Sequence, residues 1–382
     1  MHFLKLFSIL FTASFLAANN SYTEQIQEFQ NFKKTQQSAF NNYLKSQEEA
    51  FSNYKKELRV FWNDPKLSNK KEWITYTNDK KTRTDINFEE ETITIETIAN
   101  DKSEAKQKIA IALAKAVTID TKTAYESDPL EQKLKKIPKP QGLIDKQPDT
   151  QPILKNVLFS EDVTQKELLQ YVGRNTQEIQ VKQEKNNTNY FVKIKLPKDT
   201  TYKRSKEYYA EVQLNAKRQN ISLHLIFSII HSESAYNPMA RSHVPAYGLM
   251  QIVPQTAGID AYNFLYNEKK LLSGSYLYNS KNNIKLGSAY LHILYFKYLK
   301  SIKNPQSRLY CTIAAYNTGA GNVARAFSAT NNVASAAKII NQLSPEEVYR
   351  RLLKDLKYDE PKEYLKRVTK RIKVYEEIYK QS

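Results

Sequence analysis

A glutamate in the second half of the chain occupies a position that suits a general acid. The stretch from 222 to 238 reads SLHLIFSIIHSESAYNP, with apolar residues at helical spacing until Asn237-Pro238 ends the pattern. Glu233 lies three residues after Ile230, so it projects from the apolar face near the C-terminal end of the helix. Burial and the helix dipole both disfavour a carboxylate there, so the pKa of Glu233 should be raised.

A carboxyl group that stays protonated near neutral pH is what general-acid cleavage of a glycosidic bond requires. The alternative for Glu233 is a structural ion pair with a neighbouring Arg or Lys. The stretch alone leaves both interpretations open, so the motifs around it must decide between them.

Two further motifs carry polar groups that suit a sugar. Gly248 opens a loop in which the amide of Gln251 can donate to and accept from acetamido or hydroxyl groups. Tyr316-Asn317 precedes a Gly-Ala-Gly turn, which can end a helix and let the backbone approach a ligand closely. Aromatic residues at helical spacing more often belong to a core, but four large side chains are candidates for lining a groove: Met250, Tyr276, Tyr278 and Tyr290.

The motifs occur in an order that is similar to one enzyme family. The second half resembles the catalytic domain of the lytic murein transglycosylases, which have an all-helical, goose-type-lysozyme-like fold. The matching segments span roughly residues 220–370 and are Glu233-Ser234 with Tyr236-Asn237-Pro238, Gly248 to Ile252, Asn283-Ile284 with Gly287 and Tyr290-Leu291, Ala315 to Gly321, and Glu363 to Val368. The resemblance implies cleavage of the β-1,4 bond between N-acetylmuramic acid and N-acetylglucosamine, with closure of a 1,6-anhydro ring on the muramoyl product.

The same resemblance assigns roles to individual residues. It implies that Glu233 protonates the leaving oxygen and then takes the proton of the muramic acid C6 hydroxyl. It implies no cofactor and no metal. The substrate-binding positions that it implies are Ser234, Met250, Gln251, Tyr316, Asn317 and Tyr364.

The scarcity of acids near Glu233 also favours a mechanism with one carboxylate. Between Ile221 and Ser328 the only other acids are Asp260 and Glu268, which lie outside every matched motif. Hydrolysis by a carboxylate pair needs a second carboxyl group about 5–9.5 Å from the first. A lysozyme-like muramidase that hydrolyses the same bond and a non-catalytic peptidoglycan-binding protein remain the alternatives.

The first half of the chain has the mixed pattern of an α+β domain. Aromatic residues at spacings of three, seven and eight predict an amphipathic helix over 24–62. Alternating runs predict a hairpin or three-stranded meander over 72–98 and a second hairpin over 178–197. A helix is expected over 105–117, and the prolines between 129 and 152 favour an extended stretch. No strand is expected after residue 200.

The run from Trp73 to Ile98 resembles the N-terminal domain of the membrane-bound lytic murein transglycosylase C family. We therefore expect three segments, which are a signal peptide over 1–18, an α+β domain over 19–198 and the catalytic domain over 199–382. Residues 1–18 combine Lys5, an apolar run and Ala17-Ala18, as secretory signals do. They contain no cysteine for a lipid anchor, so a periplasmic protein that is not a lipoprotein is expected.

Composition excludes several classes of protein. The 382 residues carry a formal net charge of +18, and 41% of them are hydrophobic, so the chain is basic and can form a core. A single cysteine, Cys311, excludes an internal disulfide. Export makes the glycan strands of peptidoglycan a better anionic partner than nucleic acid, and the charge is compatible with peripheral association with the envelope.

Overall fold

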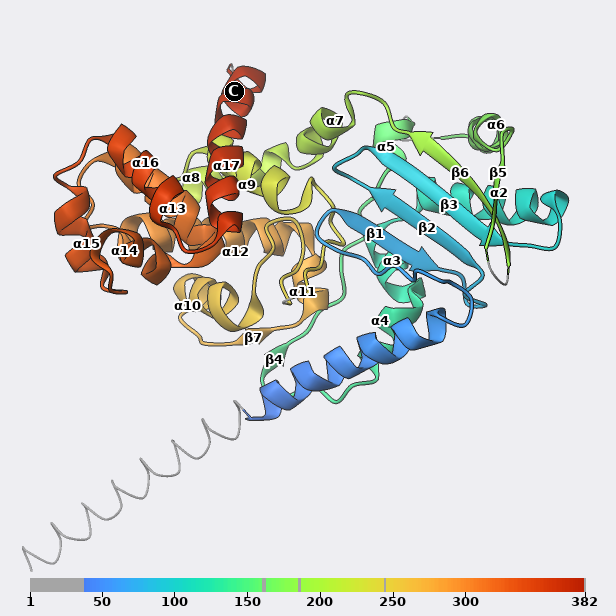
Figure 1. Ribbon diagram of the computed structural model, residues 1–382, viewed down its shortest axis with the longest axis horizontal. Coiled ribbons are helices and arrows are strands. Elements are labelled where there is room, and N and C mark those ends of the chain that lie inside the picture. The colour runs from blue at the N-terminus through green and yellow to red at the C-terminus, as the bar shows by residue number, and fades with distance from the viewer. Residues whose placement is uncertain (1–37, 160–162, 185–186, 244, 381–382) are drawn as a thin grey trace, which may run out of the picture.

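The computed structural model describes residues 38–159, 163–184, 187–243 and 245–380. The predicted signal peptide lies outside these residues, as does the first part of the helix expected over 24–62. The described part of that helix covers 38–58 and is followed by a turn. Figure 1 shows the sheet on one side of the molecule and most helices on the other, with helix 38–58 along the lower edge.

Both predicted strand regions form and join in a single antiparallel sheet. The strands are β1 (Glu72–Tyr76), β2 (Thr82–Asn87), β3 (Thr92–Ile98), β5 (Gln180–Gln183) and β6 (Thr188–Lys195). Their order is β1-β2-β3-β6-β5, so the meander and the second hairpin meet between β3 and β6, where Ile95 lies opposite Val192. The helix α2 (Lys102–Thr118) packs on the sheet. It begins before the predicted residue because Asp101 accepts hydrogen bonds from the first-turn nitrogens of Ser103 and Glu104.

The proline-containing stretch is not simply extended as expected. Its first seven residues form the helix α4 (Pro129–Lys135), and no helix follows between 136 and 152. Two further short helices, α3 (Thr121–Ser127) and α5 (Lys155–Leu158), lie just before and just after the stretch. Pro129 occupies the first turn of α4, where no backbone donor is needed, and Asp128 caps the same helix. After a gap in the described residues, α6 (Gln165–Asn175) precedes β5.

The second half is helical except for one two-residue strand that was not expected. This strand, β7 (Leu271–Leu272), pairs in parallel with β4 (Leu143–Ile144) of the first half. The helices are α7 (Thr200–Glu207), α8 (Tyr209–Gln219), α9 (Leu223–Ser234), α10 (Ile259–Tyr266), α11 (Gly274–Tyr278), α12 (Ser280–His292), α13 (Pro305–Thr318), α14 (Ala320–Ser328), α15 (Val333–Ile340), α16 (Pro345–Asp355) and α17 (Asp359–Ile378), with π-helical turns at Pro254–Gly258 and Ile293–Tyr298.

The two halves share buried contacts. One continuous cluster of buried apolar side chains runs from Ile86 under the sheet to Leu365 in α17. Arg204 is almost fully buried, and its guanidinium donates to the carbonyls of Ile153 and Tyr236. The guanidinium thus joins the segment before α5 in the first half to the end of α9 in the second. The expected boundary at 198/199 therefore separates two kinds of secondary structure rather than two separate cores, and it stays a prediction.

Candidate active site

Glu233 lies at the end of α9, where the chain leaves the helix abruptly. Its side chain is on the buried face, and the residue is 5% exposed. Ala235 and Tyr236 both have left-handed backbone conformations, with φ of 49° and 65°. Such conformations cost about 1 kcal/mol or more for residues other than glycine. The strain is held by buried contacts, since the Tyr236 hydroxyl donates to that of Tyr375 at 2.6 Å.

Burial raises the pKa of the Glu233 carboxyl group, and the charges around it offset that effect only in part. The ammonium group of Lys70, whose Nζ lies 3.9 Å from Oε2, is the largest opposing influence. Lys71 also lowers the pKa of Glu233, whereas the Glu360 carboxylate raises it. Glu233 therefore forms an ion pair with Lys70, as the structural alternative in the sequence analysis supposed. The Lys70 side chain is 37% exposed, however, and the pKa of Glu233 remains raised.

Two tyrosines flank the acid. Burial followed by the charge of Glu233 raises the pKa of both Tyr316 and Tyr364, so both hydroxyls stay protonated beside the carboxyl group. The Tyr364 hydroxyl also lowers the pKa of Glu233, although it makes no hydrogen bond of regular geometry with a described residue. The Tyr316 hydroxyl donates to the Met250 carbonyl at 2.8 Å. Tyr290 packs beside Tyr316, with ring centres 5.7 Å apart.

The loop from Gly248 to Ile252 is shaped by two left-handed residues. Gly248 has φ +72°, and a Cβ there would lie 2.3 Å from the Leu277 carbonyl oxygen, so only glycine fits. Gln251 has φ 48°, and its Nε2 donates to the Gly248 carbonyl at 3.0 Å. Its buried Oε1 has no hydrogen-bond partner among the described residues. Gln251 therefore keeps one unused acceptor.

Met250 is part of the core rather than of a groove. Its side chain is fully buried and packs on Gly287, where a Cβ would lie 2.3 Å from its sulfur. This contact explains the glycine inside α12. The Met250 backbone nitrogen donates to Asn283 Oδ1 at 2.7 Å. The Asn283 amide donates in turn to the carbonyls of Tyr247 and Leu277, so one side chain in α12 holds the loop.

Ser234 is also fully buried and contacts backbone. Its hydroxyl lies 3.0 Å from the Ile230 carbonyl oxygen and 2.8 Å from that of Leu249. It therefore connects the end of α9 to the loop that carries Gln251.

Asn317 is partly buried in the last turn of α13.

The other two aromatic candidates, Tyr276 and Tyr278, contact residues other than Glu233. Tyr278 donates to Glu131 at 3.3 Å and packs against Tyr247. Tyr276 is buried in α11. The Tyr278 contact with Glu131 belongs to the junction with the first half, whereas Tyr276 interacts with Tyr262 and Tyr266 of α10.

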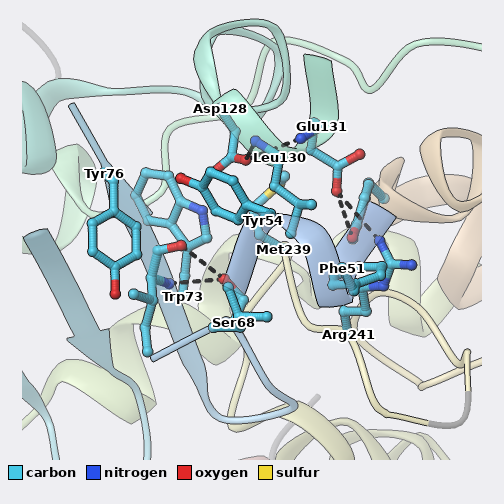
Figure 2. Close-up of a pocket in the computed structure, with 13 residues that line it drawn as sticks. Phe51, Tyr54, Ser68, Trp73, Tyr76, Asp128, Leu130, Glu131, Met239 and Arg241 are labelled. Carbon is cyan, nitrogen blue, oxygen red and sulfur yellow. Dashed lines mark hydrogen bonds and ion pairs between the residues drawn. The ribbon is translucent and has the colours of Figure 1, made fainter. Parts of the chain in front are cut away.

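Figure 2 shows a pocket at that junction, which is lined by residues of both halves, among them Phe51, Glu131 and Arg241. The Arg241 guanidinium packs over Phe51 of helix 38–58, with its central carbon 3.8 Å from the ring centre, and lies 3.8 Å from Glu131. Burial raises the pKa of Glu131 from 4.5 to about 7, against the opposing charge of Arg241. Because Arg241 lies shortly before Gly248, this pair anchors the loop to the N-terminal half.

Comparison with known proteins identifies the family. Residues 211–339 match the transglycosylase SLT domain, and residues 32–207 match the N-terminal domain of membrane-bound lytic murein transglycosylase C. The protein of that name from Cronobacter sakazakii is 33% identical over 325 residues, which are 82% of this chain and 84% of the relative. The chain belongs to the lytic murein transglycosylases.

Two further proteins are similar to this chain to different extents. Membrane-bound lytic murein transglycosylase C of Haemophilus ducreyi is 33% identical over 81% of this chain and 80% of its own length. An inactive mutant of the lytic transglycosylase Slt from Pseudomonas aeruginosa, whose structure is solved, is 26% identical over 44% of this chain and 24% of that chain, with a TM-score of 0.35.

The fold class expected from the sequence is confirmed, because the chain is an α+β N-terminal region followed by the helical, lysozyme-like catalytic domain of the lytic transglycosylases. Among the described residues no helix is long and apolar enough to cross a membrane. Within the same residues no group of three His, Cys, Asp or Glu side chains could hold a metal ion.

Three residues near the acid were not among the site residues predicted from the sequence. Asn283 was noted only as part of a motif, and Lys70 was not considered. Glu360, in the first turn of α17, lies outside the interval in which acids were counted, yet its Oε1 is 3.5 Å from Lys70 Nζ. The two acids inside that interval contact other side chains, since Asp260 accepts from Tyr298 and Glu268 pairs with Lys270.

Proposed function

We propose that this lytic transglycosylase cleaves the glycan strands of peptidoglycan with Glu233 as its only acid and base. The observation that carries the proposal is a carboxyl group 5% exposed at the end of α9, with its pKa raised by burial and two protonated tyrosines beside it. A buried carboxyl group of this kind can donate a proton near neutral pH.

The reaction follows from that protonation state. Glu233 gives its proton to the glycosidic oxygen as the bond to C1 of the muramic acid breaks, and the acetamido group of the same sugar stabilises the positive charge at C1. The C6 hydroxyl then attacks C1 and loses its proton to the Glu233 carboxylate. The product carries a 1,6-anhydro ring, no water is consumed, and Glu233 ends protonated as it began.

The remaining residues act in two groups. The hydroxyls of Tyr316 and Tyr364 lie close enough to Glu233 to feel its charge, and the Gln251 amide lies on the loop that Ser234 joins to α9. We propose that these three side chains orient the acetamido group and stabilise the developing charge. Asn317 stays a proposed substrate contact. Ser234, with its hydroxyl on backbone carbonyls, and Met250, in the core, support this site as positioning residues rather than by touching the sugar.

A second candidate function rests on Glu360. The Glu360 and Glu233 carboxyl groups lie 3.5 Å and 3.9 Å, respectively, from the Lys70 ammonium group. A hydrolase needs two carboxyl groups near each other, so Glu360 is a candidate for the second one. Glu360 is 67% exposed and already paired, which disfavours it as an activating base for water.

Mass spectrometry of the products separates these functions. Purified sacculi are incubated with the mature protein in water labelled with oxygen-18. We expect soluble anhydro-muropeptides without label, whereas a muramidase would give labelled reducing ends. Glu233→Gln should abolish release while thermal unfolding stays similar, because the amide cannot donate the proton. Normal release by this variant would remove Glu233 from the mechanism, and no release by the wild type would favour a binding protein.

We also propose that the protein works in the periplasm, exported through residues 1–18. The relatives are named as membrane-bound enzymes, and the net charge of +18 suits an anionic cell-wall polymer. Fractionation of cells that produce the full chain tests this localisation, and recovery in the cytoplasm would contradict it.

A further inference from the structure

The N-terminal half supplies a cation to the catalytic acid. Lys70 lies just before β1, yet its Nζ is 3.9 Å from Oε2 of Glu233 and 3.5 Å from Oε1 of Glu360 in α17. These three residues come from three segments that are far apart in the sequence. No motif of the catalytic domain contains Lys70.

Lys71 and its partners hold this segment in place. The Lys71 ammonium group donates to the His231 carbonyl near the end of α9 at 2.9 Å and pairs with Glu89 at 2.6 Å. Glu89 also binds Arg371 of α17 at 3.0 Å, and Arg371 donates to the Ser232 hydroxyl. These contacts join the sheet to both helices beside Glu233, and they place the neighbouring Lys70 next to the acid.

We propose that Lys70 is a positioning residue through which the N-terminal half stabilises the Glu233 carboxylate between proton donation and proton return. The inference rests on the proposed function, since Glu233 passes through that charged state only if it donates its proton during the reaction. Glu360 also pairs with the Lys70 ammonium group, so it weakens the stabilisation that Lys70 gives to the Glu233 carboxylate.

The charged and titratable groups that act on Glu233 come from three elements. The segment before β1 supplies Lys70 and Lys71, which lower the pKa of Glu233. The helix α17 supplies Glu360, which raises it, and Tyr364, which lowers it. The helix α13 supplies Tyr316, whose own pKa is raised by the charge of Glu233.

The pH profile of muropeptide release tests the proposal. Activity should fall at high pH, where Glu233 has lost its proton. The alkaline limb of the pH profile therefore reports the pKa of Glu233. Lys70→Met should move the limb to higher pH by about one unit, the low end for a neighbouring opposite charge because Lys70 is partly exposed. Lys70→Arg should restore the wild-type limb. Glu360→Gln should move the limb in the opposite direction, to lower pH.

If Lys70 had only a structural role, Lys70→Met and Glu360→Gln would not shift the alkaline limb in opposite directions. If the limb of Lys70→Met superimposes on that of the wild type, the inference is wrong. A rise in KM with an unmoved limb would also overturn it, because it would make Lys70 a substrate contact.

A readout without turnover separates this inference from the proposed function. Titration of carbon-13-labelled glutamate side chains by NMR, with Glu233→Gln to assign the signal, should show the same opposite shifts. Absence of anhydro product from the wild type would refute the proposed function. Normal anhydro product with an unshifted Glu233 titration in Lys70→Met would refute this inference alone.

Discussion

Asn283 holds the backbone of Met250 in place. Its Oδ1 accepts a hydrogen bond from the Met250 nitrogen at 2.7 Å, while its Nδ2 donates to the carbonyls of Tyr247 and Leu277. All of these groups are buried in the described structure. The Gly248 to Ile252 loop therefore takes its shape from a side chain in α12, and Gln251 takes its place from that shape.

We expect Asn283→Ala to destabilise the protein by on the order of 3 kcal/mol, because three buried backbone groups lose their partner. Asn283→Asp should lower the stability by nearly as much, since a carboxylate cannot donate hydrogen bonds to the carbonyls of Tyr247 and Leu277. Chemical denaturation measures both. Asn279→Ala, which removes only the N-terminal cap of the same helix, is the control and should cost about 1 kcal/mol. Equal losses for Asn283→Ala and Asn279→Ala would contradict the role of Asn283.

Two glycines with positive φ make a matched pair of substitutions. At Gly248 an added Cβ would lie 2.3 Å from the Leu277 carbonyl oxygen, whereas at Gly319, with φ +86°, nothing lies within 4 Å. Gly319→Ala should therefore cost only backbone strain, about 1–3 kcal/mol. Gly248→Ala should cost clearly more, because overpacking adds to a similar strain. The melting temperatures of the two variants test this prediction. If Gly248→Ala is more stable than Gly319→Ala, the loop can move to make room for the added Cβ.

Ser234 can be compared with another buried serine of the same helix. Ser228 donates only to the His224 carbonyl within α9, whereas Ser234 also reaches the Leu249 carbonyl. We expect Ser234→Ala to lower kcat with little change in KM, and Ser228→Ala to leave both unchanged. The loss of stability for Ser234→Ala should be about 1–3 kcal/mol. A rise in KM for Ser234→Ala would instead support the direct substrate contact that the family resemblance implies.

The buried Glu131 should make stability depend on pH. Burial raises the pKa of Glu131 from 4.5 to about 7, so the folded state favours the protonated form. Stability from this group is complete below its unfolded pKa and is lost as the pH rises through the folded value. The shift corresponds to about 3 kcal/mol.

Glu131→Gln keeps the shape of the side chain and removes the charge. Its melting temperature should fall less than that of the wild type between about pH 5 and pH 8. Glu126→Gln, an exposed acid of α3, is the control and should behave as the wild type. If Glu131→Gln shows the wild-type pH dependence, the pair with Arg241 keeps Glu131 charged throughout.

Much of the fold was predictable because its signals are local. Alternation in Thr92–Ile98 gives a strand with one face in the core, and that alternation is visible in the sequence. The start of the proline-containing stretch was mistaken for an extended segment, because Pro129 was counted as a breaker although Asp128 before it caps the helix α4. The strand β7 was missed because two residues have no periodicity.

The candidate site was predictable only in part. Glu233 could be found because its distance from Ile230 places it on the apolar face of a helix. Met250 was expected to face substrate, but a motif does not tell which side of a loop a side chain occupies. The structure places it on Gly287, and the contact between a large and a small residue on different elements decides this.

The sequence by itself indicated most of the strands and helices, the family and the proposed acid, since these depend on the spacing of residues along a few turns or strands. Only the tertiary structure decided which charges surround that acid. Lys70, Glu233 and Glu360 meet because the sheet packs on the ends of α9 and α17. Electrostatic interactions act through space over a few ångströms, and separation along the chain carries no information about them.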